Sequence, residues 1–230
     1  MRTTPDALML FAAGFGTRMG ALTANRPKPL IPVAGKALID HALDLAVAAG
    51  MARVVANVHY LGEQVVQHLA GRDVLISDET DEILETGGGL RKALPLLGQG
   101  PVFTLNTDAV WSGPNVISTL RSQWDGARMS ALLALIPAEE AVGHRGTGDF
   151  ALDADGRISR GGPYVYTGAQ ILNPAGIETI SETAFSLNRL WDRMIAEGRA
   201  YGVLHQGGWC DVGRPESIPL AEAMLERADG

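Results

Sequence analysis

Short apolar runs alternate with segments of helical period along the first half of the chain, and Gly-rich turns separate them. The apolar run ALMLF comes first. It is followed, after a loop, by IDHALDLAVAAG, whose apolar residues share one helix face before a glycine at a C-cap position. This alternation is typical of α/β proteins. We therefore expect an α/β fold of Rossmann-like type, with a mostly parallel sheet flanked by helices.

Further elements follow the same rule. The pattern predicts strands at 53–58, 73–77, 101–106, 129–136, 164–172 and 202–205, a hairpin at 148–160, and helices at 63–69, 90–97, 116–124, 185–197 and after 215. The strand PVFTLN delivers Asn106, Thr107 and Asp108 to its carboxyl end, where open α/β sheets collect their ligands. We expect one domain, with the second half forming a wall or lid on the first.

Composition excludes several classes of protein. The formal net charge is −7, with 26 acids against 19 bases, so we expect no broad attraction to nucleic acid or to an anionic membrane. The single cysteine, Cys210, cannot form an intrachain disulfide. The N-terminus MRTTPDALML lacks the basic and apolar regions of a signal peptide, and no run reaches the length of a membrane span. We expect a cytoplasmic protein.

The segment after the first strand matches neither of two well-known phosphate-binding loop patterns. The dinucleotide fingerprint needs three glycines; Gly14 and Gly16 fit, but Met19 stands in the third place. The P-loop pattern ends in Lys followed by Ser or Thr, whereas Lys36 is followed by Ala37. The glycines therefore belong to a different kind of loop, or only turn a strand into a surface segment.

Charge favours a phosphate site. No acid lies between Ala7 and Ile39, although that segment holds Arg18, Arg26, Lys28 and Lys36, and the rest of the chain carries 15 bases against 26 acids. Glycines would let backbone N–H groups approach an anion. Prolines on both sides of Lys28 fix its backbone in an extended form. A cationic loop in an acidic chain predicts a polyphosphate ligand.

The segment AAGFGTRMGALTANRPKPLIPVAGKALI resembles the signature AAGxGxRMxPLTxxxPKPLxPVxGxPLI of the sugar-1-phosphate nucleotidyltransferases. Ala21 and Ala37 stand where that family usually has proline. The resemblance implies that Arg18 and Lys28 are catalytic cations that neutralise a nucleoside triphosphate. It also implies a nucleotide-binding loop made of Ala12, Ala13, Gly14, Gly16 and Thr17.

Nucleotidyl transfer implies a metal site. Expulsion of pyrophosphate from the α-phosphorus needs charge compensation, for which Mg²⁺ held by carboxylates is the expected tool. The resemblance assigns Asp108, in LNTD, as a catalytic metal ligand and Asp211, in GGWCDVG, as the second ligand. Thr107 replaces the family's glycine and Arg214 its threonine. Without the resemblance, a turn residue would be the favoured interpretation of Asp108, and Asp211 could simply shape the start of the helix near Pro215.

Substrate contacts are expected at two further places. The resemblance places ETGGG against the nucleobase and ribose through Thr86, Gly87 and Gly88, and backbone N–H groups at that helix N-terminus could meet ligand oxygens. The alternative is a purely structural role, in which the glycine triplet only gives the helix a flexible start. For the sugar we expect four contacts: Asn106, Asp149, Arg160 and Gly168. Arg160 would suit the lactyl carboxylate of muramic acid.

Two histidines and the cysteine are interpreted as structural. His59 and His68 lie eight intervening residues apart, which is not a zinc spacing. Cys210 has no activating base nearby in sequence.

Within the family, four segments resemble the compact uridylyltransferases that act on N-acetylmuramic acid 1-phosphate in cell-wall sugar recycling: ANVHYLGEQVVQHL, SDETDEILETGGGLRKALPLLG, FSLNRLWDRMIAEGRAYG and WCDVGRPES. This resemblance covers nearly the whole chain. The resemblance implies one domain over 1–230 without a C-terminal extension, with a nucleotide-binding half at about 1–125 and a sugar-binding half at about 126–230. UTP and a sugar 1-phosphate are the expected partners, in a monomer or small homo-oligomer. Three alternatives stay open: a guanylyl- or thymidylyltransferase, a non-catalytic nucleotide-sugar sensor and, disfavoured by the failed fingerprint, a nicotinamide-dependent oxidoreductase.

Overall fold

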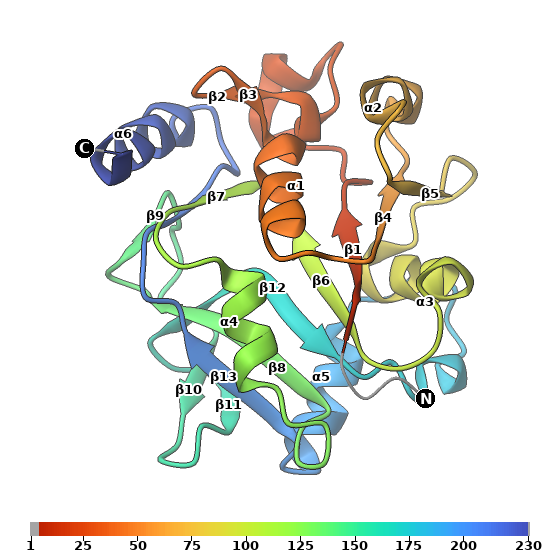
Figure 1. The fold of residues 1–230 in the computed structure, drawn as a ribbon, viewed down its shortest axis with the longest axis vertical. Coiled ribbons are helices and arrows are strands. Elements are labelled where there is room, and N and C mark those ends of the chain that lie inside the picture. Colours follow the sequence, from red (N-terminus) through yellow and green to blue (C-terminus); the bar gives the residue numbers. More distant parts are fainter. Residues whose placement is uncertain (1–4, 230) are drawn as a thin grey trace.

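A parallel four-stranded core forms the centre of the main sheet. The computed structural model describes residues 5–229, so residues 1–4 of the N-terminal stretch and residue 230 lie outside the described part. The core strands are β1 (Ala7–Phe11), β4 (Arg53–Val58), β5 (Leu75–Asp78) and β6 (Val102–Asn106). Their order is β5-β4-β1-β6, and every neighbouring pair is parallel (Figure 1). After β1 the chain forms β4 and β5 on one side of that strand and then β6 on its other side. This reversal of strand order creates a topological switch point between β1 and β6.

The second half of the chain extends the same sheet with mostly antiparallel strands. β12 pairs with β6 and with β8, and β10 and β11 form a hairpin beside β12. Only β13 runs parallel to its neighbour, β8. The bounds are β8 (Ala131–Pro137), β10 (Phe150–Leu152), β11 (Ile158–Arg160), β12 (Tyr164–Leu172) and β13 (Ala200–Leu204). The predicted mostly parallel α/β fold is confirmed for its core, and one nine-stranded sheet joins both halves.

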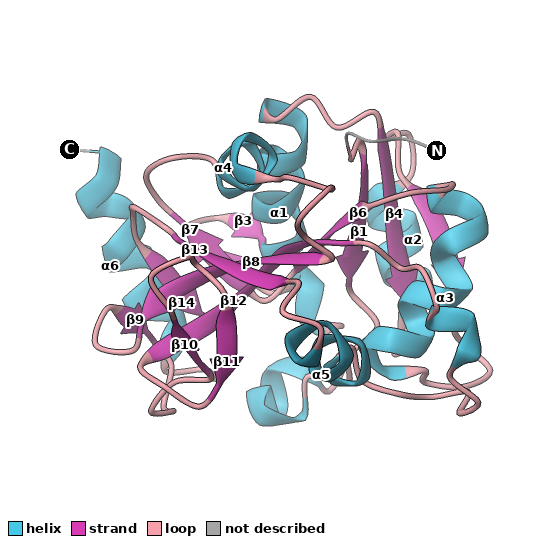
Figure 2. Cartoon of the chain, turned by 90° about the horizontal axis from the view of Figure 1, so that it is seen from below, coloured by secondary structure: helices cyan, strands magenta, loops and turns pink. Residues whose placement is uncertain are grey.

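Helices cover both faces of this sheet. Alternate residues of β1 point to opposite sides, so Leu8 and Leu10 pack in one core cluster and Ala7 and Met9 in another. The first cluster is covered by α1 (Leu38–Ala48), α2 (Gly62–Leu69) and α4 (Val116–Gln123), and the second by α3 (Glu85–Leu97) and α5 (Asn188–Ala196). Figure 2 shows the sheet between α1 and α4 on one side and α5 on the other.

A small second sheet stands beside the main one and carries the end of the chain. β14 (Trp209–Asp211) pairs with β7 (Ala109–Trp111) and β9 (Ala141–Val142), and α6 (Ser217–Asp229) packs on it. β7 follows β6 directly in sequence. The pairing therefore brings the predicted metal ligands together, because Asp211 lies opposite Ala109 in register. The remaining short elements are η1 (Thr17–Thr23), η2 (Lys28–Leu30), η3 (Ile177–Thr179), β2 (Pro32–Val33) and β3 (Lys36–Ala37).

Two helix starts differ from the sequence prediction for a common reason. Helix α3 begins at Glu85 and contains the glycine triplet, and α5 begins at Asn188 and not at Phe185. The carbonyl of Phe185 accepts hydrogen bonds from the amides of Gly87 and Gly88, at 2.7 and 3.1 Å. A Cβ on Gly87 would lie 2.4 Å from the Phe185 ring. Glycine lets the start of α3 pack against the segment before α5, which therefore stays outside the helix.

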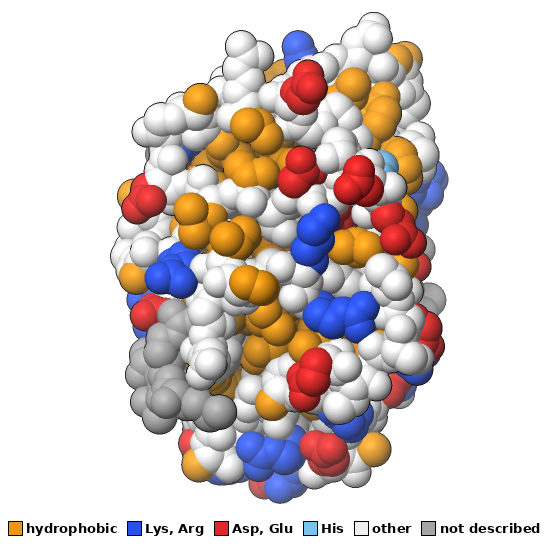
Figure 3. Space-filling model, turned by 90° about the vertical axis from the view of Figure 1, so that its right-hand side faces the viewer, with side chains coloured by type: hydrophobic (Ala, Val, Ile, Leu, Met, Phe, Trp, Pro, Cys, Tyr) orange, Lys and Arg blue, Asp and Glu red, His pale blue; other side chains and the backbone are white. Residues whose placement is uncertain are grey.

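Figure 3 shows the face of the molecule that includes α3. Acidic and basic side chains are interspersed on this face. Among residues 5–229, no helix has both the length and the apolar character needed to cross a membrane.

Candidate active site

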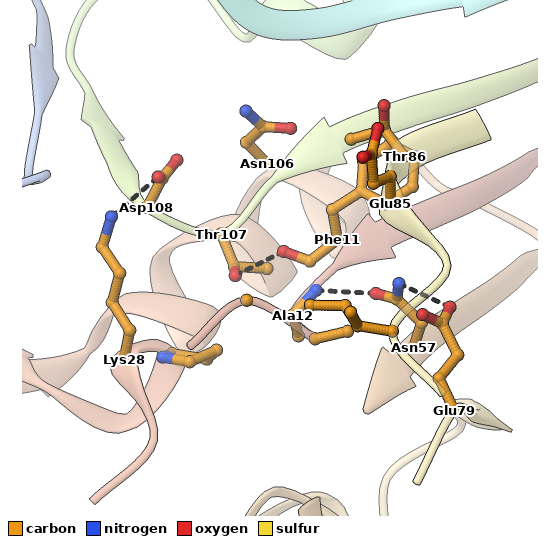
Figure 4. Close-up of a pocket in the computed structure, with 14 residues that line it drawn as sticks. Phe11, Ala12, Lys28, Asn57, Glu79, Glu85, Thr86, Asn106, Thr107 and Asp108 are labelled. Atoms are coloured by element: carbon orange, nitrogen blue, oxygen red, sulfur yellow. Dashed lines mark hydrogen bonds and ion pairs between the residues drawn. The ribbon is translucent and has the colours of Figure 1, made fainter. Parts of the chain in front are cut away.

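A pocket opens where β1 and β6 end, at the switch point of the sheet. Its walls come from the loop after β1, the loop after β6, the end of β4 and the start of α3. Figure 4 shows that Lys28 and Asp108 lie at one end, and Asn57 and Glu79 at the other. The lining residues are Phe11, Ala12, Ala13, Gly14, Lys28, Pro29, Asn57, Glu79, Ile83, Glu85, Thr86, Asn106, Thr107 and Asp108. Six of the predicted site residues on the first strand loop, α3 and β6 therefore share this pocket with Lys28.

The glycine loop is shaped by its close approach to Lys28. Gly16 has φ +64°, and a Cβ there would lie 2.8 Å from Cβ of Lys28. Both facts require glycine at this position. Gly14 lines the pocket and is exposed, with open space around its Cα. Thr17 begins η1 and is exposed, and neither Gly16 nor Thr17 lines the pocket. Gly16 thus allows the loop to pack against Lys28, while Gly14 faces the pocket.

Lys28 is a buried cation on a stiff support. Pro27 adopts an extended backbone, but Lys28 begins the 3-10 helix η2 with Pro29 next to it, so the extended backbone predicted for Lys28 is wrong. The two prolines still fix φ on both sides of Lys28. The residue is only 8% exposed, and its Nζ donates to Oδ2 of Asp108 at 2.7 Å. The carboxylate of Asp108 is the ion-pair partner of Lys28, and a phosphate group of a ligand could take its place.

The two predicted metal carboxylates face opposite electrostatic environments. Burial alone would raise the pKa of Asp108, but the charge and hydrogen bond of Lys28, together with the charge of Arg18, hold it below the ordinary value. Burial, followed by the negative charge of Asp108, raises the pKa of Asp211. The two carboxylates therefore lie close enough to repel each other.

This pair fits a divalent cation. A metal between them would remove the repulsion that raises the pKa of Asp211. The Val212 amide donates to the Asp108 carbonyl at 2.8 Å, so the two segments are tied together independently of any metal. Within residues 5–229, no three His, Cys, Asp or Glu side chains gather as a metal cluster. Two carboxylates with phosphate and water oxygens is the ligand set that Mg²⁺ commonly takes.

Arg18 reaches the same place from η1. A Cβ built on Gly213 would lie 3.0 Å from Nη2 of Arg18 and 3.0 Å from both carboxylate oxygens of Asp211. Glycine at 213 therefore leaves a gap between the cation and the carboxylate. The charge of Arg18 helps to hold the pKa of Asp108 below its ordinary value and partly offsets the rise in the pKa of Asp211. The structure thus brings the four residues predicted for charge compensation into one cluster.

The other end of the pocket holds a polar pair that the sequence analysis missed. The Ala12 amide donates to Oδ1 of Asn57 at 2.8 Å, and Nδ2 of Asn57 donates to Oε1 of Glu79 at 2.8 Å (Figure 4). Burial raises the pKa of Glu79. A polar residue inside the apolar run RVVANV was the available signal for Asn57, because buried strand positions are usually apolar.

Of the three residues predicted to contact the base and ribose, one lines the pocket. Thr86 lines the pocket, and its Oγ1 accepts from the Leu187 amide at 3.0 Å. Gly87 and Gly88 are buried outside the lining, and their amides donate to Phe185. Contrary to expectation, these two amides are therefore not available to a ligand in this structure.

The predicted sugar residues fall into two groups. Asn106 lines the pocket, and Gly168 (φ +88°) lies directly behind it, since a Cβ there would be 2.8 Å from Cβ of Asn106. Asp149 and Arg160 lie outside the pocket lining. Oδ2 of Asp149 accepts from the Tyr166 amide at 2.8 Å. Nη2 of Arg160 donates to Oδ1 of Asp192 at 2.7 Å, so its charge already has a partner.

The remaining predictions concern structural side chains. His68 Nε2 lies 2.9 Å from Oδ1 of Asp40, in a contact between α2 and α1. The His59 ring packs edge-on against Phe15, with ring centroids 5.1 Å apart. Cys210 is buried, and burial raises the pKa of its thiol to about 12. This thiol is a core group and not a nucleophile. Thr107 turns inward, and its Oγ1 donates to the Phe11 carbonyl at 2.8 Å.

Comparisons with known proteins agree with this site. Residues 8–147 match the MobA-like NTP transferase domain. The chain is 43% identical to the N-acetylmuramate alpha-1-phosphate uridylyltransferase of Caulobacter vibrioides, over 99% of this chain and 100% of the relative. It is 31% identical to the protein of the same name from Neisseria meningitidis serogroup B, over 94% and 96%.

A solved structure shows the same fold. The inositol-1-phosphate CTP transferase from T. maritima superposes with a TM-score of 0.77 at 17% identity, over 100% of this chain and 99% of the other. The predicted family is confirmed by the sequence matches, and the chain belongs to the MobA-like NTP transferases as a sugar-1-phosphate nucleotidyltransferase.

Proposed function

We propose that the chain transfers a uridylyl group from UTP to N-acetylmuramic acid 1-phosphate in the presence of Mg²⁺, giving UDP-N-acetylmuramic acid and pyrophosphate. One observation carries the proposal: two cations and two carboxylates from four separate segments form one cluster, in which Lys28 and Asp108 line the pocket and Arg18 and Asp211 lie beside it. The choice of base and sugar rests on the 43% identity to a relative of that name over nearly the whole chain. Such a reaction belongs to cell-wall sugar recycling.

The residues divide the work of charge compensation. Lys28 and Arg18 neutralise the triphosphate, and Asp108 and Asp211 hold Mg²⁺, which supplies further positive charge to the reacting phosphates when bound. The nucleophile is a phosphate oxygen of the sugar phosphate, which is already largely ionised near neutral pH and needs no general base. An oxygen of that phosphate forms the new bond to the α-phosphorus as the bond to pyrophosphate breaks. Positioning and electrostatics are therefore what the protein has to provide.

Substrate positioning follows from the geometry of the pocket. The loop Ala12–Gly14 faces the ligand space beside Lys28, and Thr86 and Asn106 line the opposite wall. We assign the nucleotide to the loop and Thr86, and the sugar to Asn106, which Gly168 backs. Asp149 and Arg160 stay hypotheses for sugar binding, because neither lines the pocket.

The decisive experiment is a grid of pyrophosphate release with Mg²⁺. It crosses the four ribonucleoside triphosphates and dTTP with the 1-phosphates of N-acetylmuramic acid, N-acetylglucosamine, glucose and mannose. Turnover confined to UTP and the muramic sugar supports the proposal. Turnover with GTP or dTTP and another sugar keeps the reaction and replaces the substrates. No pyrophosphate release with any pair, together with measurable nucleotide binding, favours a non-catalytic nucleotide-sugar sensor.

A further inference from the structure

Tyr60 lies at the corner between β4 and α2, where it holds the loop that follows β1. Figure 1 shows α2 beside this loop. Oη of Tyr60 lies 2.9 Å from the Thr23 carbonyl and 3.2 Å from the Ala24 carbonyl, and the two share its one O–H donor. Nε2 of Gln64, in the first turn of α2, donates to the Asn25 carbonyl at 3.1 Å. Two side chains of one corner therefore hold three consecutive carbonyls of the loop.

Contacts continue from this corner to Lys28. Oγ1 of Thr23 lies 3.1 Å from the carbonyl oxygens of both Gly16 and Gly20, and Thr23 is only 6% exposed. A Cβ built on Gly16 would lie 3.0 Å from Cγ2 of Thr23 and 2.8 Å from Cβ of Lys28. Gly16 is therefore packed between Thr23 and Lys28. Because close-packed groups transmit displacements, a shift of Thr23 changes the support of the lysine.

The same part of the chain fixes both ends of this loop. At its start, the Ala12 amide donates to Asn57 in β4, and further along, Tyr60 holds the residues after η1. Between these contacts the only helical element is the short η1, which is kinked at Gly20, with φ +57°. A segment with so little regular structure has many conformations to lose, so its order in the free protein depends on such contacts.

We propose that Tyr60 is a positioning residue for the triphosphate, and that its hydroxyl group keeps Lys28 in place through Thr23 and Gly16. Tyr60 does not line the pocket, so it acts on the ligand only through the loop. The inference rests on the proposed nucleotidyl transfer, which assigns the triphosphate to Lys28. Because the effect reaches the ligand through that lysine, it concerns the phosphate groups and spares the base and the ribose.

Tyr60→Phe is the test variant, because it keeps the ring, whose centroid lies 5.8 Å from that of Phe15, and removes only the hydroxyl group. If the free loop then adopts its binding form only part of the time, the affinity for a triphosphate falls in proportion to that fraction. We expect the Kd of a nucleoside triphosphate to rise by about 3- to 10-fold, the range for one lost hydrogen bond. The Kd of the nucleoside alone, which has no phosphate, should change by less than about twofold.

Two further variants calibrate this result. Tyr164→Phe is the matched control, since Tyr164 is another half-buried tyrosine outside the pocket lining, and it should leave both Kd values unchanged. Gln64→Met removes the neighbouring hydrogen bond to Asn25 and leaves Tyr60 in place. It should raise the triphosphate Kd in the same direction but less, because this contact is exposed.

Amide exchange reads the loop without any ligand. The amides of Met19 and Ala24 donate to the carbonyls of Gly16 and Ala21, at 2.8 and 3.3 Å. Exchange at these two amides reports local opening of η1, which need not change the global unfolding temperature. We expect both amides to exchange faster in ligand-free Tyr60→Phe than in ligand-free wild type.

The measurement is binding of UTP, GTP and dTTP with Mg²⁺ and of the corresponding nucleosides by competition, so the test does not depend on which base is preferred. A rise in Kd confined to triphosphates, together with faster amide exchange in the free loop, supports the proposal. Equal rises for triphosphate and nucleoside show a general disturbance of the pocket and overturn it. An unchanged triphosphate Kd in Tyr60→Phe also overturns it. The last two results leave the proposed nucleotidyl transfer intact, since pyrophosphate release by the wild type tests that separately.

Discussion

The two ends of the pocket use the same functional group in opposite ways. At the phosphate end, Asp108 is ion-paired with Lys28, which holds the pKa of the carboxyl group below its ordinary value in spite of burial. At the other end, Glu79 accepts a hydrogen bond from the neutral side-chain amide of Asn57, and burial raises the pKa of its carboxyl group. The carboxyl group beside cations therefore has a lowered pKa, whereas the buried one beside an amide has a raised pKa. The neighbours, and not the residue type, decide the role.

The largest expected effect concerns Asp108. Asp108→Asn keeps the shape of the side chain but removes the charge that holds Mg²⁺ and pairs with Lys28. We expect turnover to fall by roughly 10³-fold or more, since even changes behind metal ligands cost about 10- to 100-fold. The matched control is Asp73→Asn, an exposed acid with no role in the site, which should leave turnover unchanged. Near-normal rates in Asp108→Asn, measured by pyrophosphate release, contradict the metal assignment.

Lys28 separates position from charge in the cationic segment. Lys28→Met removes a buried cation from the pocket, and we expect a loss of about 10²- to 10³-fold in kcat/KM, as for other donors that stabilise developing negative charge. Lys36 belongs to the same segment but is exposed and pairs with Asp44, so Lys36→Met should stay close to wild type. Equal losses in the two variants would mean that the segment acts through its total charge and not through one placed cation.

The sequence predicts the end of the pocket that holds Lys28 far better than the end that holds Asn57 and Glu79. The loop from Ala12 to Lys28 is nearly contiguous, and its glycines, prolines and charges already specify a stiff cationic turn. Asn57 and Glu79 are 22 residues apart and meet only because β4 and β5 pair in parallel, with Asn57 opposite Ser77. No short-range pattern encodes that register.

Long-range packing also explains why two amides that were predicted to meet the ligand do not face the pocket. The Gly87 and Gly88 amides are occupied by Phe185, a residue almost a hundred positions later in the chain. A glycine triplet predicts close approach to something, but the sequence does not say whether a ligand or another part of the chain makes that approach. The parallel core, in contrast, follows from local periodicity and was predicted within a few residues at each end.

The pH dependence of thermal stability should reveal the cost of burying the Glu79 carboxylate. Burial raises the pKa of Glu79 above its ordinary 4.5, so the folded state binds this proton more tightly than the unfolded state. The resulting stabilisation is fully present below the unfolded pKa and is lost as the pH rises through the folded pKa. We expect Glu79→Gln to unfold at a higher temperature than wild type at pH 8, with the difference vanishing at pH 4. Equal Tm values at pH 8, with Glu82→Gln as reference, would contradict the buried charge.

The smallest effect is expected at Arg160, which repeats the Lys28–Asp108 pair in an exposed setting. Its guanidinium donates to Asp192 and stacks on Phe150, with Cζ 5.1 Å from the ring centroid. A sugar carboxylate would have to displace Asp192, and exposed ion pairs contribute only ~0.2–1 kcal/mol. We expect Arg160→Ala to change the preference for muramic over glucosamine 1-phosphate by less than about fivefold. The variant Asp192→Asn frees the guanidinium without removing it. A larger loss of preference in Arg160→Ala, together with tighter muramic binding in Asp192→Asn, would establish Arg160 as the group that reads the lactyl carboxylate.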